Sequence, residues 1–183
     1  MLKRNKTVFG LHDTAYEKSS CGVGFITRKD GVQTHKLLEK GHEALCSVPH
    51  RGGMSAEGVG DGAGVSVDLS IEFFQKITNI DLKAGQFGVG NFFMPNRQDQ
   101  RDKACQLIAS SLADNGLEIL VERDIAVDNE VLRSAAIDLQ LPITQWIFIA
   151  PVGISGVKFE KLIYSVLLAI ESQAYTDVEL DGL

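Results

Sequence analysis

A stretch dense in glycine, residues 51–65 (RGGMSAEGVGDGAGV), constrains what this chain can fold into more than any other feature. Glycine destabilises helix interiors and adopts backbone conformations that other residues avoid. The stretch is therefore too rich in glycine for a helix, and its spacing is too irregular for a low-complexity repeat. It predicts a shaped loop that leads into a strand over residues 64–69.

The composition of this loop leaves two interpretations. Its alternating glycines, Gly58 to Gly64, look like a dinucleotide-binding fingerprint, but such a loop follows a strand and opens a helix. This one follows a predicted helix and precedes a predicted strand, so a nucleotide phosphate site is excluded. The loop is either a tight structural turn or one side of a site that holds a small polar substrate. In the second case the Arg51 guanidinium would donate several hydrogen bonds in a fixed geometry. Asp61 would pair with Arg51 or fix the loop.

Helices and strands alternate on both sides of the loop. Residues 29–31 (KDG) supply the turn of a predicted hairpin over 21–33, and helical spacing predicts a helix from Thr34 to about Val48. The later part of the chain predicts strands over 85–94, 117–126 and 142–151, and helices over 96–115 and 159–171. This order predicts one layered domain of mixed α/β (α+β) type, with a mostly antiparallel sheet in its first part.

Composition and net charge limit the kinds of molecule that this chain is expected to bind. With 183 residues, 44% of them hydrophobic, and a net charge of -6, the chain can form a core, and its acidic surplus argues against nucleic acid or an anionic membrane. No apolar run reaches the ~18 residues that a membrane span requires. Residues 1–20 begin basic but lack a continuous apolar stretch, so export is not expected. We expect a cytoplasmic protein whose partners are small molecules or proteins.

The cysteines suggest chemistry at one position. Cys21, Cys46 and Cys105 form no close pair and no metal-binding spacing, which favours reduced thiols and no metal site. Cys46 and Cys105 fall on predicted helices whose apolar faces favour burial. Cys21 instead opens the stretch CGVGFI among small residues that leave it open to approach.

A thiol nucleophile needs a base, and Cys21 has two candidates. His50, beside Arg51, is one, although a histidine where a helix becomes a loop also packs without a catalytic role. The other is the α-amine of Cys21 itself, which becomes free if the chain is cut after Ser20. The alternative for Cys21 is a buried structural cysteine.

Three stretches in one order resemble a known family. CGVGFI at 21–26, HRGG at 50–53 and GDGAGVSVDLSIEFF at 60–74 look like the amino-terminal glutaminase domain of the glutamate synthase large subunit. That domain is a class II glutamine amidotransferase of the N-terminal-nucleophile hydrolase type. LPITQWIFIAP at 141–151, with the helix after it, resembles the same domain, so the resemblance runs from about Cys21 to the end of the chain.

The resemblance implies an αββα sandwich, here incomplete, with residues 1–20 as a propeptide-like segment and 21–183 as the N-terminal part of the amidotransferase domain. It implies that Cys21 attacks the side-chain amide of glutamine, that its α-amine moves the protons, and that water hydrolyses a thioester. The ammonia passes to a synthase domain or subunit that forms glutamate from 2-oxoglutarate with FMN and iron–sulfur clusters, none of which are expected in this chain. Arg51 and Gly52 match the residues beside the nucleophile, and Asp61 shapes the loop.

The sequence differs from the family pattern at several motifs, and these differences allow a second function. The 183 residues contain no HxRFSTN-like substrate clamp, no Asn-Gly of the family type for the oxyanion and no matching acidic residue for the substrate amine. We therefore expect this chain to be inactive alone. It is either the glutaminase part of a glutamate synthase or a non-catalytic binding or assembly module with the same fold. Both alternatives are compatible with a homo-oligomer.

Overall fold

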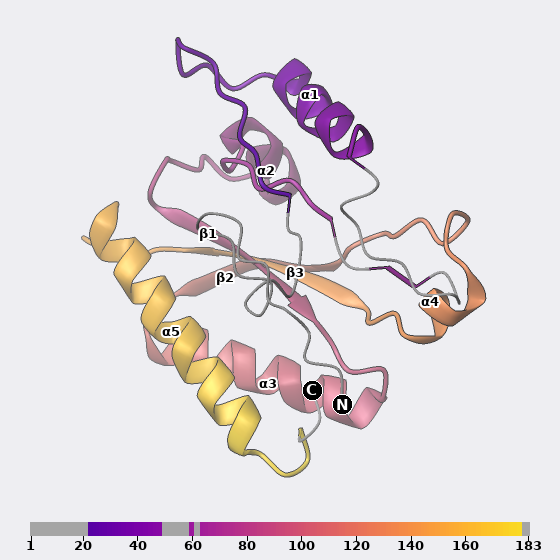
Figure 1. Cartoon of the computed structure of the whole chain (residues 1–183). Helices are drawn as coiled ribbons and strands as arrows, with labels where there is room; N and C mark the ends of the chain where they lie inside the picture. The colour runs from indigo at the N-terminus through magenta and orange to yellow at the C-terminus, as the bar shows by residue number, and fades with distance from the viewer. Residues whose placement is uncertain (1–21, 49–58, 61–62, 181–183) are drawn as a thin grey trace, which may run out of the picture. The chain divides into compact units, whose positions relative to one another are not determined.

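A computed structural model describes residues 22–48, 59–60 and 63–180 (Figure 1). The chain divides into two compact units, Met1–Val67 and Asp68–Leu183, here called the first and the second unit. The described elements follow the order α1 (His35–Cys46), α2 (Ile71–Thr78), β1 (Phe87–Phe93), α3 (Gln98–Asp114), β2 (Glu118–Asp124), α4 (Ser134–Asp138), β3 (Ile143–Ile149) and α5 (Val157–Thr176). The structure is thus of mixed α/β type, as predicted.

In the first unit the predicted helix is confirmed, and the predicted strands are wrong over the residues described. Helix α1 starts after Thr34, whose backbone is extended, and none of its residues is buried. The predicted turn is present, because the Gly31 amide donates to the Arg28 carbonyl at 3.1 Å and Gly31 has a φ of 68°. Residues 22–28 and 63–69, however, form no strand. A strand needs a neighbour to bond its backbone groups, and sequence periodicity does not supply one.

Helix α2 was not predicted from the sequence. Ser70 caps it, since its hydroxyl accepts a hydrogen bond from the Phe73 amide at 3.4 Å, and Glu72 lies in its first turn. The helix ends at Asn79, which has a left-handed φ of 56° and whose amide donates to the Gln75 carbonyl at 2.8 Å. This cap stops the helix after two turns.

The sheet of the second unit has three strands in the order β1-β3-β2, and both pairs are antiparallel. All three strands were predicted within a few residues of their bounds. The antiparallel type is confirmed, but this sheet lies in the second part of the chain rather than the first. Gly88 pairs with Phe148 across the sheet, and a Cβ on Gly88 would lie 2.5 Å from the Phe148 ring. The glycine therefore makes room for the aromatic side chain.

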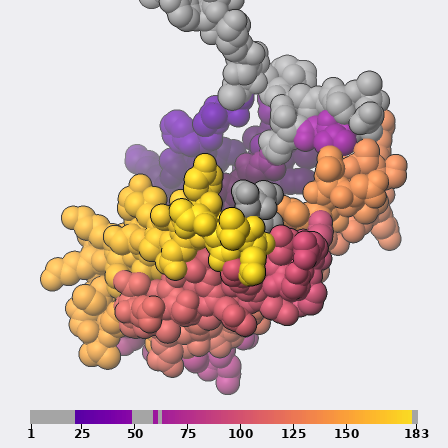
Figure 2. Space-filling model, turned by 90° about the horizontal axis from the view of Figure 1, so that it is seen from below, coloured from indigo at the N-terminus to yellow at the C-terminus, as the bar shows by residue number. Residues whose placement is uncertain are grey.

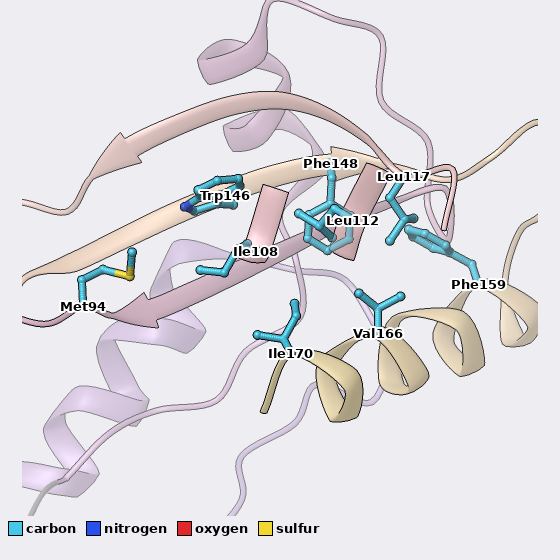
Figure 3. Packing of buried hydrophobic residues seen from close by; sticks show 9 residues of the cluster. All are labelled: Met94, Ile108, Leu112, Leu117, Trp146, Phe148, Phe159, Val166 and Ile170. Atoms are coloured by element: carbon cyan, nitrogen blue, oxygen red, sulfur yellow. The ribbon is translucent and has the colours of Figure 1, made fainter. Parts of the chain in front are cut away.

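Helices α3 and α5 pack on one face of this sheet (Figure 1). The core between them is made of large apolar side chains (Figure 3), with Phe159 fully buried. Its buried members are Met94, Ile108, Leu112, Leu117, Trp146, Phe148, Phe159, Val166 and Ile170. A smaller cluster occupies the other face, where Phe74 of α2 and Leu82 pack against Phe87 and Ile147.

Candidate functional site

The predicted site residues lie outside the part of the chain that the structure describes. Cys21, Arg51, Gly52 and Asp61 are all in this position, as is His50. Their roles therefore stay predictions. The structure describes the segments that flank them, namely residues 22–48, 59–60 and 63–69.

The segment that follows Cys21 is extended and open within the first unit. Val23 and Phe25 are almost fully exposed, and a Cβ on Gly24 would meet no atom within 4 Å. The residues just after Cys21 are thus open to solvent, while the surroundings of Cys21 itself lie outside the described residues.

Cys105 lies on α3 and is half-buried, as the sequence predicts. Its thiol donates to the Glu122 carboxylate, with 3.7 Å between Sγ and Oε1. Burial, with the negative charge of Glu122 second, raises the pKa of the Cys105 thiol to about 11. This thiol is protonated at neutral pH, so it is a poor nucleophile.

Cys46 is exposed at the end of α1, whereas the sequence predicted that it would be buried. The apolar residues Leu37 and Leu45 define one face of this helix, and Cys46 follows Leu45 on the turn that faces water. Its Sγ lies 3.6 Å from Nε2 of His42, one turn earlier. Its accessibility therefore distinguishes this thiol from the half-buried Cys105.

A row of polar side chains crosses the sheet of the second unit and was not singled out from the sequence. Arg123 donates from Nε and Nη2 to Oε1 of Gln145, at 2.9 and 2.6 Å, and Gln145 donates to Oδ1 of Asn91 at 2.9 Å. Gln145 is only 8% exposed, and the Arg123 guanidinium lies 5.9 Å from the centre of the Phe73 ring. Thr144 and Gln145 are the two polar residues of the strand ITQWIFI, and a polar pair in a mostly apolar strand is the signal that could have identified this row. The row satisfies its own buried groups and joins all three strands.

An open hollow of about 420 Å³ lies at the end of this sheet, lined by residues between Asn96 and Ile143. Two of its polar side chains bind backbone carbonyls: Asn96 donates to Gln140 at 3.3 Å, and Arg101 donates to Pro95 at 3.3 Å. None of the lining residues is a cysteine, serine, threonine or histidine. The hollow therefore offers polar contacts but no thiol, hydroxyl or imidazole group.

Within 22–48, 59–60 and 63–180, no three or more His, Cys, Asp and Glu side chains gather in a way that could hold a metal ion. No helix in these ranges combines the length and the apolar character needed to span a membrane.

Comparison with known proteins identifies relatives over most of the chain. The model of the family "Glutamine amidotransferases class-II" matches residues 21–181. Glutamate synthase [NADH] of Saccharomyces cerevisiae is 34% identical over 145 residues, which are 74% of this chain and 7% of the yeast protein. The glutamate synthase [NADPH] large chain of Bacillus subtilis is 29% identical over 173 residues, 92% of this chain and 11% of that protein. Ferredoxin-dependent glutamate synthase 2 of Synechocystis is 32% identical over 165 residues, 87% of this chain and 11% of that protein.

The chain thus spans about a tenth or less of the length of these relatives, while the family match covers nearly all of it from Cys21 onward. Both findings agree with the motifs at 21–26, 50–53 and 60–74. The chain belongs to the class II glutamine amidotransferases and is homologous to the large chains of glutamate synthases.

Proposed function

We propose that this chain supplies the glutaminase activity of a glutamate synthase, with Cys21 as the nucleophile. The observation that carries the proposal is the match of the class II family model, which begins at Cys21 itself. The raised pKa of the Cys105 thiol supports the choice of Cys21, because the half-buried thiol is kept protonated. Removal of residues 1–20 would free the Cys21 α-amine.

The proposed reaction needs one nucleophile and one base on the same residue. The α-amine takes the thiol proton, and the Cys21 sulfur attacks the side-chain carbonyl carbon of glutamine. The carbon–nitrogen bond breaks, and the proton moves to the leaving nitrogen, so ammonia departs and a γ-glutamyl thioester remains. Water, deprotonated by the amine, attacks the thioester and releases glutamate and the free thiol.

The glycine-rich loop would form one wall of this site. Arg51 is assigned to hold the substrate beside the thiol, because a guanidinium presents a fixed fork of donors to a carboxylate or carbonyl. Gly52 would let the substrate lie against the main chain, since it has no side chain to block it. Asp61 is assigned a shaping role, by pairing with Arg51 or with the loop backbone.

We also propose the αββα sandwich of N-terminal-nucleophile hydrolases as the complete fold. The second unit supports this, because its antiparallel sheet carries α3 and α5 on one face, as a sheet and an outer helix layer of such a sandwich would.

Partners and compartment follow from the same proposal. Glutamine is the proposed substrate, and ammonia would pass to a synthase domain or subunit that makes glutamate from 2-oxoglutarate. FMN and iron–sulfur clusters are assigned to that separate part, since this chain matches only 7 to 11% of its relatives. The proposed pathway is cytoplasmic glutamate biosynthesis in nitrogen assimilation.

The test is glutamine hydrolysis by the protein purified with its partners from its native host. Cys21→Ala and Cys21→Ser should abolish glutamate release, because no other thiol in the chain combines access with a base on the same residue. The matched control is Cys46→Ser, which removes another exposed thiol and should leave the rate unchanged. Full activity in Cys21→Ala would contradict the proposal and favour a non-catalytic module.

A second measurement separates processing from chemistry. A polypeptide of residues 1–183 that still carries Ser20 before Cys21 should not hydrolyse glutamine, because its α-amine is held in a peptide bond. Turnover by this unprocessed polypeptide would show that the α-amine is not the base. An intact mass of the native protein would then decide whether residues 1–20 are removed at all.

A further inference from the structure

Helix α5 has a row of apolar and aromatic residues, with one lysine and one glutamate among them, on the side opposite its core contacts. Phe159, Val166 and Ile170 point toward the sheet and are buried (Figure 3). The opposite side carries residues that follow one another in alternating steps of four and three, the repeat of a coiled-coil seam. These residues, called the outer seam, are Val157, Lys161, Tyr164, Leu168, Glu171 and Tyr175.

The outer seam is open to solvent in the second unit. Tyr164 is 62% and Tyr175 89% exposed, and Val157 and Leu168 are exposed as well. Figure 2 shows the residues of α5, in orange to yellow, at the surface of this unit. A helix that carries exposed apolar and aromatic side chains opposite its core side has more apolar surface than its own core needs, and such residues gathered on one helix face mark an interaction surface.

The order of residues in the outer seam is self-complementary. If a second copy of α5 lies antiparallel across the seam, with the centre between Tyr164 and Leu168, each position of one helix faces a defined position of the other. The facing pairs are Tyr164 with Leu168, Val157 with Tyr175, and Lys161 with Glu171. A two-fold axis repeats each pair, so both apolar contacts and the opposite-charge contact occur twice. No like charges meet in the seam.

The positions beside the seam agree with the same arrangement. In an antiparallel pair with this centre, Leu167 lies next to its own copy and adds apolar contact, and it is exposed in the second unit. Glu160 faces Ala174 of the other helix, and Lys158 faces Ser172. The flanks therefore bring no like charges together either.

The two charges of the seam are free to make this contact. Lys161 and Glu171 are ten residues apart on one helix, about 15 Å along the axis, so they do not reach each other within one chain. Over the described ranges neither takes part in an ion pair, whereas Lys103 binds both Asp177 and Glu179. A second copy would provide partners for both.

We propose that the outer seam of α5 is a homodimer interface, formed by an antiparallel pair of α5 helices around a two-fold axis. This goes beyond the proposed function and does not depend on it. A single helix pair lies at the small end of stable interfaces, so the dimer should form in the micromolar range.

The first experiment is a zero-length carbodiimide cross-link on the full chain, followed by peptide mass mapping. It should join Lys161 to Glu171, and a mixture of isotope-labelled and unlabelled chains should give mixed-mass cross-links, because the bond runs between copies. A chain that sediments as a monomer across the micromolar range and gives no such cross-link would overturn the proposal.

The second experiment reverses the charges. Lys161→Glu alone and Glu171→Lys alone should each weaken dimerisation by about tenfold or more, since each places two like-charge pairs in the seam. The double variant Lys161→Glu/Glu171→Lys should restore the wild-type dissociation constant. The matched control is Lys158→Glu, the same charge change beside the seam, which should shift the constant by less than about threefold. Unchanged dimerisation in both single variants, or no rescue in the double variant, would place the contact elsewhere and overturn the proposal.

Discussion

The second unit buries Phe159 of α5 completely in its core, whereas in the first unit Phe25 is 91% exposed and α1 buries no residue. The second unit has a sheet, two packed helices and a continuous apolar core. The first unit has a helix, a turn and extended segments over the residues described. Yet the motifs that tie the chain to its family, at 21–26 and 50–53, fall in the first unit. The difference teaches that a segment of this chain can match a family motif without contributing to a packed apolar core.

The largest expected difference between the units is in side-chain truncation. Phe159→Ala should lower the free energy of unfolding by about 3–5 kcal/mol, because it leaves a cavity in a packed core. The same change at Phe25, Phe25→Ala, should cost under about 0.5 kcal/mol in the 1–183 polypeptide. Both are measured by denaturant unfolding of that polypeptide. A cost at Phe25 that approaches the cost at Phe159 would mean that the first unit has a core of its own.

A matched pair of glycines sharpens the same comparison. Gly88→Ala should cost about 1–3 kcal/mol, because the new methyl group would lie 2.5 Å from the Phe148 ring in the sheet of the second unit. Gly24→Ala in the first unit meets no atom within 4 Å and should leave stability almost unchanged. Thermal unfolding of the two variants checks this. Equal melting temperatures for both would show that the β1–β3 contact yields more easily than its packing indicates.

Periodicity predicted most of the helices and strands, including α1, which buries no residue. The three strands, α3 and α5 were predicted because their apolar residues recur at the spacing that their burial requires. Helix α2 was missed because it is short and its SIEFF start follows a stretch interpreted as a strand. The hairpin predicted over 21–33 and the strand predicted over 64–69 show no strand at their described residues, since a strand needs a paired neighbour, which periodicity does not supply.

The candidate site could be predicted only in part. Cys21, Arg51, Gly52 and Asp61 came from glycine chemistry, the placement of the thiol and the family motifs, and the family was confirmed by the match over 21–181. The exposure of Cys46 was predicted wrongly, because a residue next to an apolar helix position can face either core or water. The row of Asn91, Gln145 and Arg123 requires the register of three strands, which periodicity does not fix.

The smallest expected effect concerns the end of α5. Lys103 donates to Asp177 and Glu179 at 2.6 Å each, and its hydrogen bond lowers the pKa of Asp177 below the ordinary value. A lowered carboxyl pKa contributes stability above the unfolded pKa of about 4, and that contribution disappears as pH falls through the folded value. Lys103→Met should therefore reduce the melting temperature slightly at pH 7 and not at strongly acid pH. The melting temperatures of both proteins are measured from pH 7 into the acid range. An equal difference in melting temperature at all pH values would show that the ion pair does not contribute to stability.

The central claim is that a thiol in the less packed unit, Cys21, is the nucleophile. The most direct measurement treats the native-host protein with diazo-oxo-norleucine, an electrophilic mimic of glutamine, and maps the modified peptides by mass. The label should appear on a peptide that begins at Cys21 with a free amine, while the exposed Cys46 and the half-buried Cys105 stay unmodified. Label on Cys46 or Cys105, or an unlabelled Cys21 still joined to Ser20 in a protein that hydrolyses glutamine, would contradict the claim.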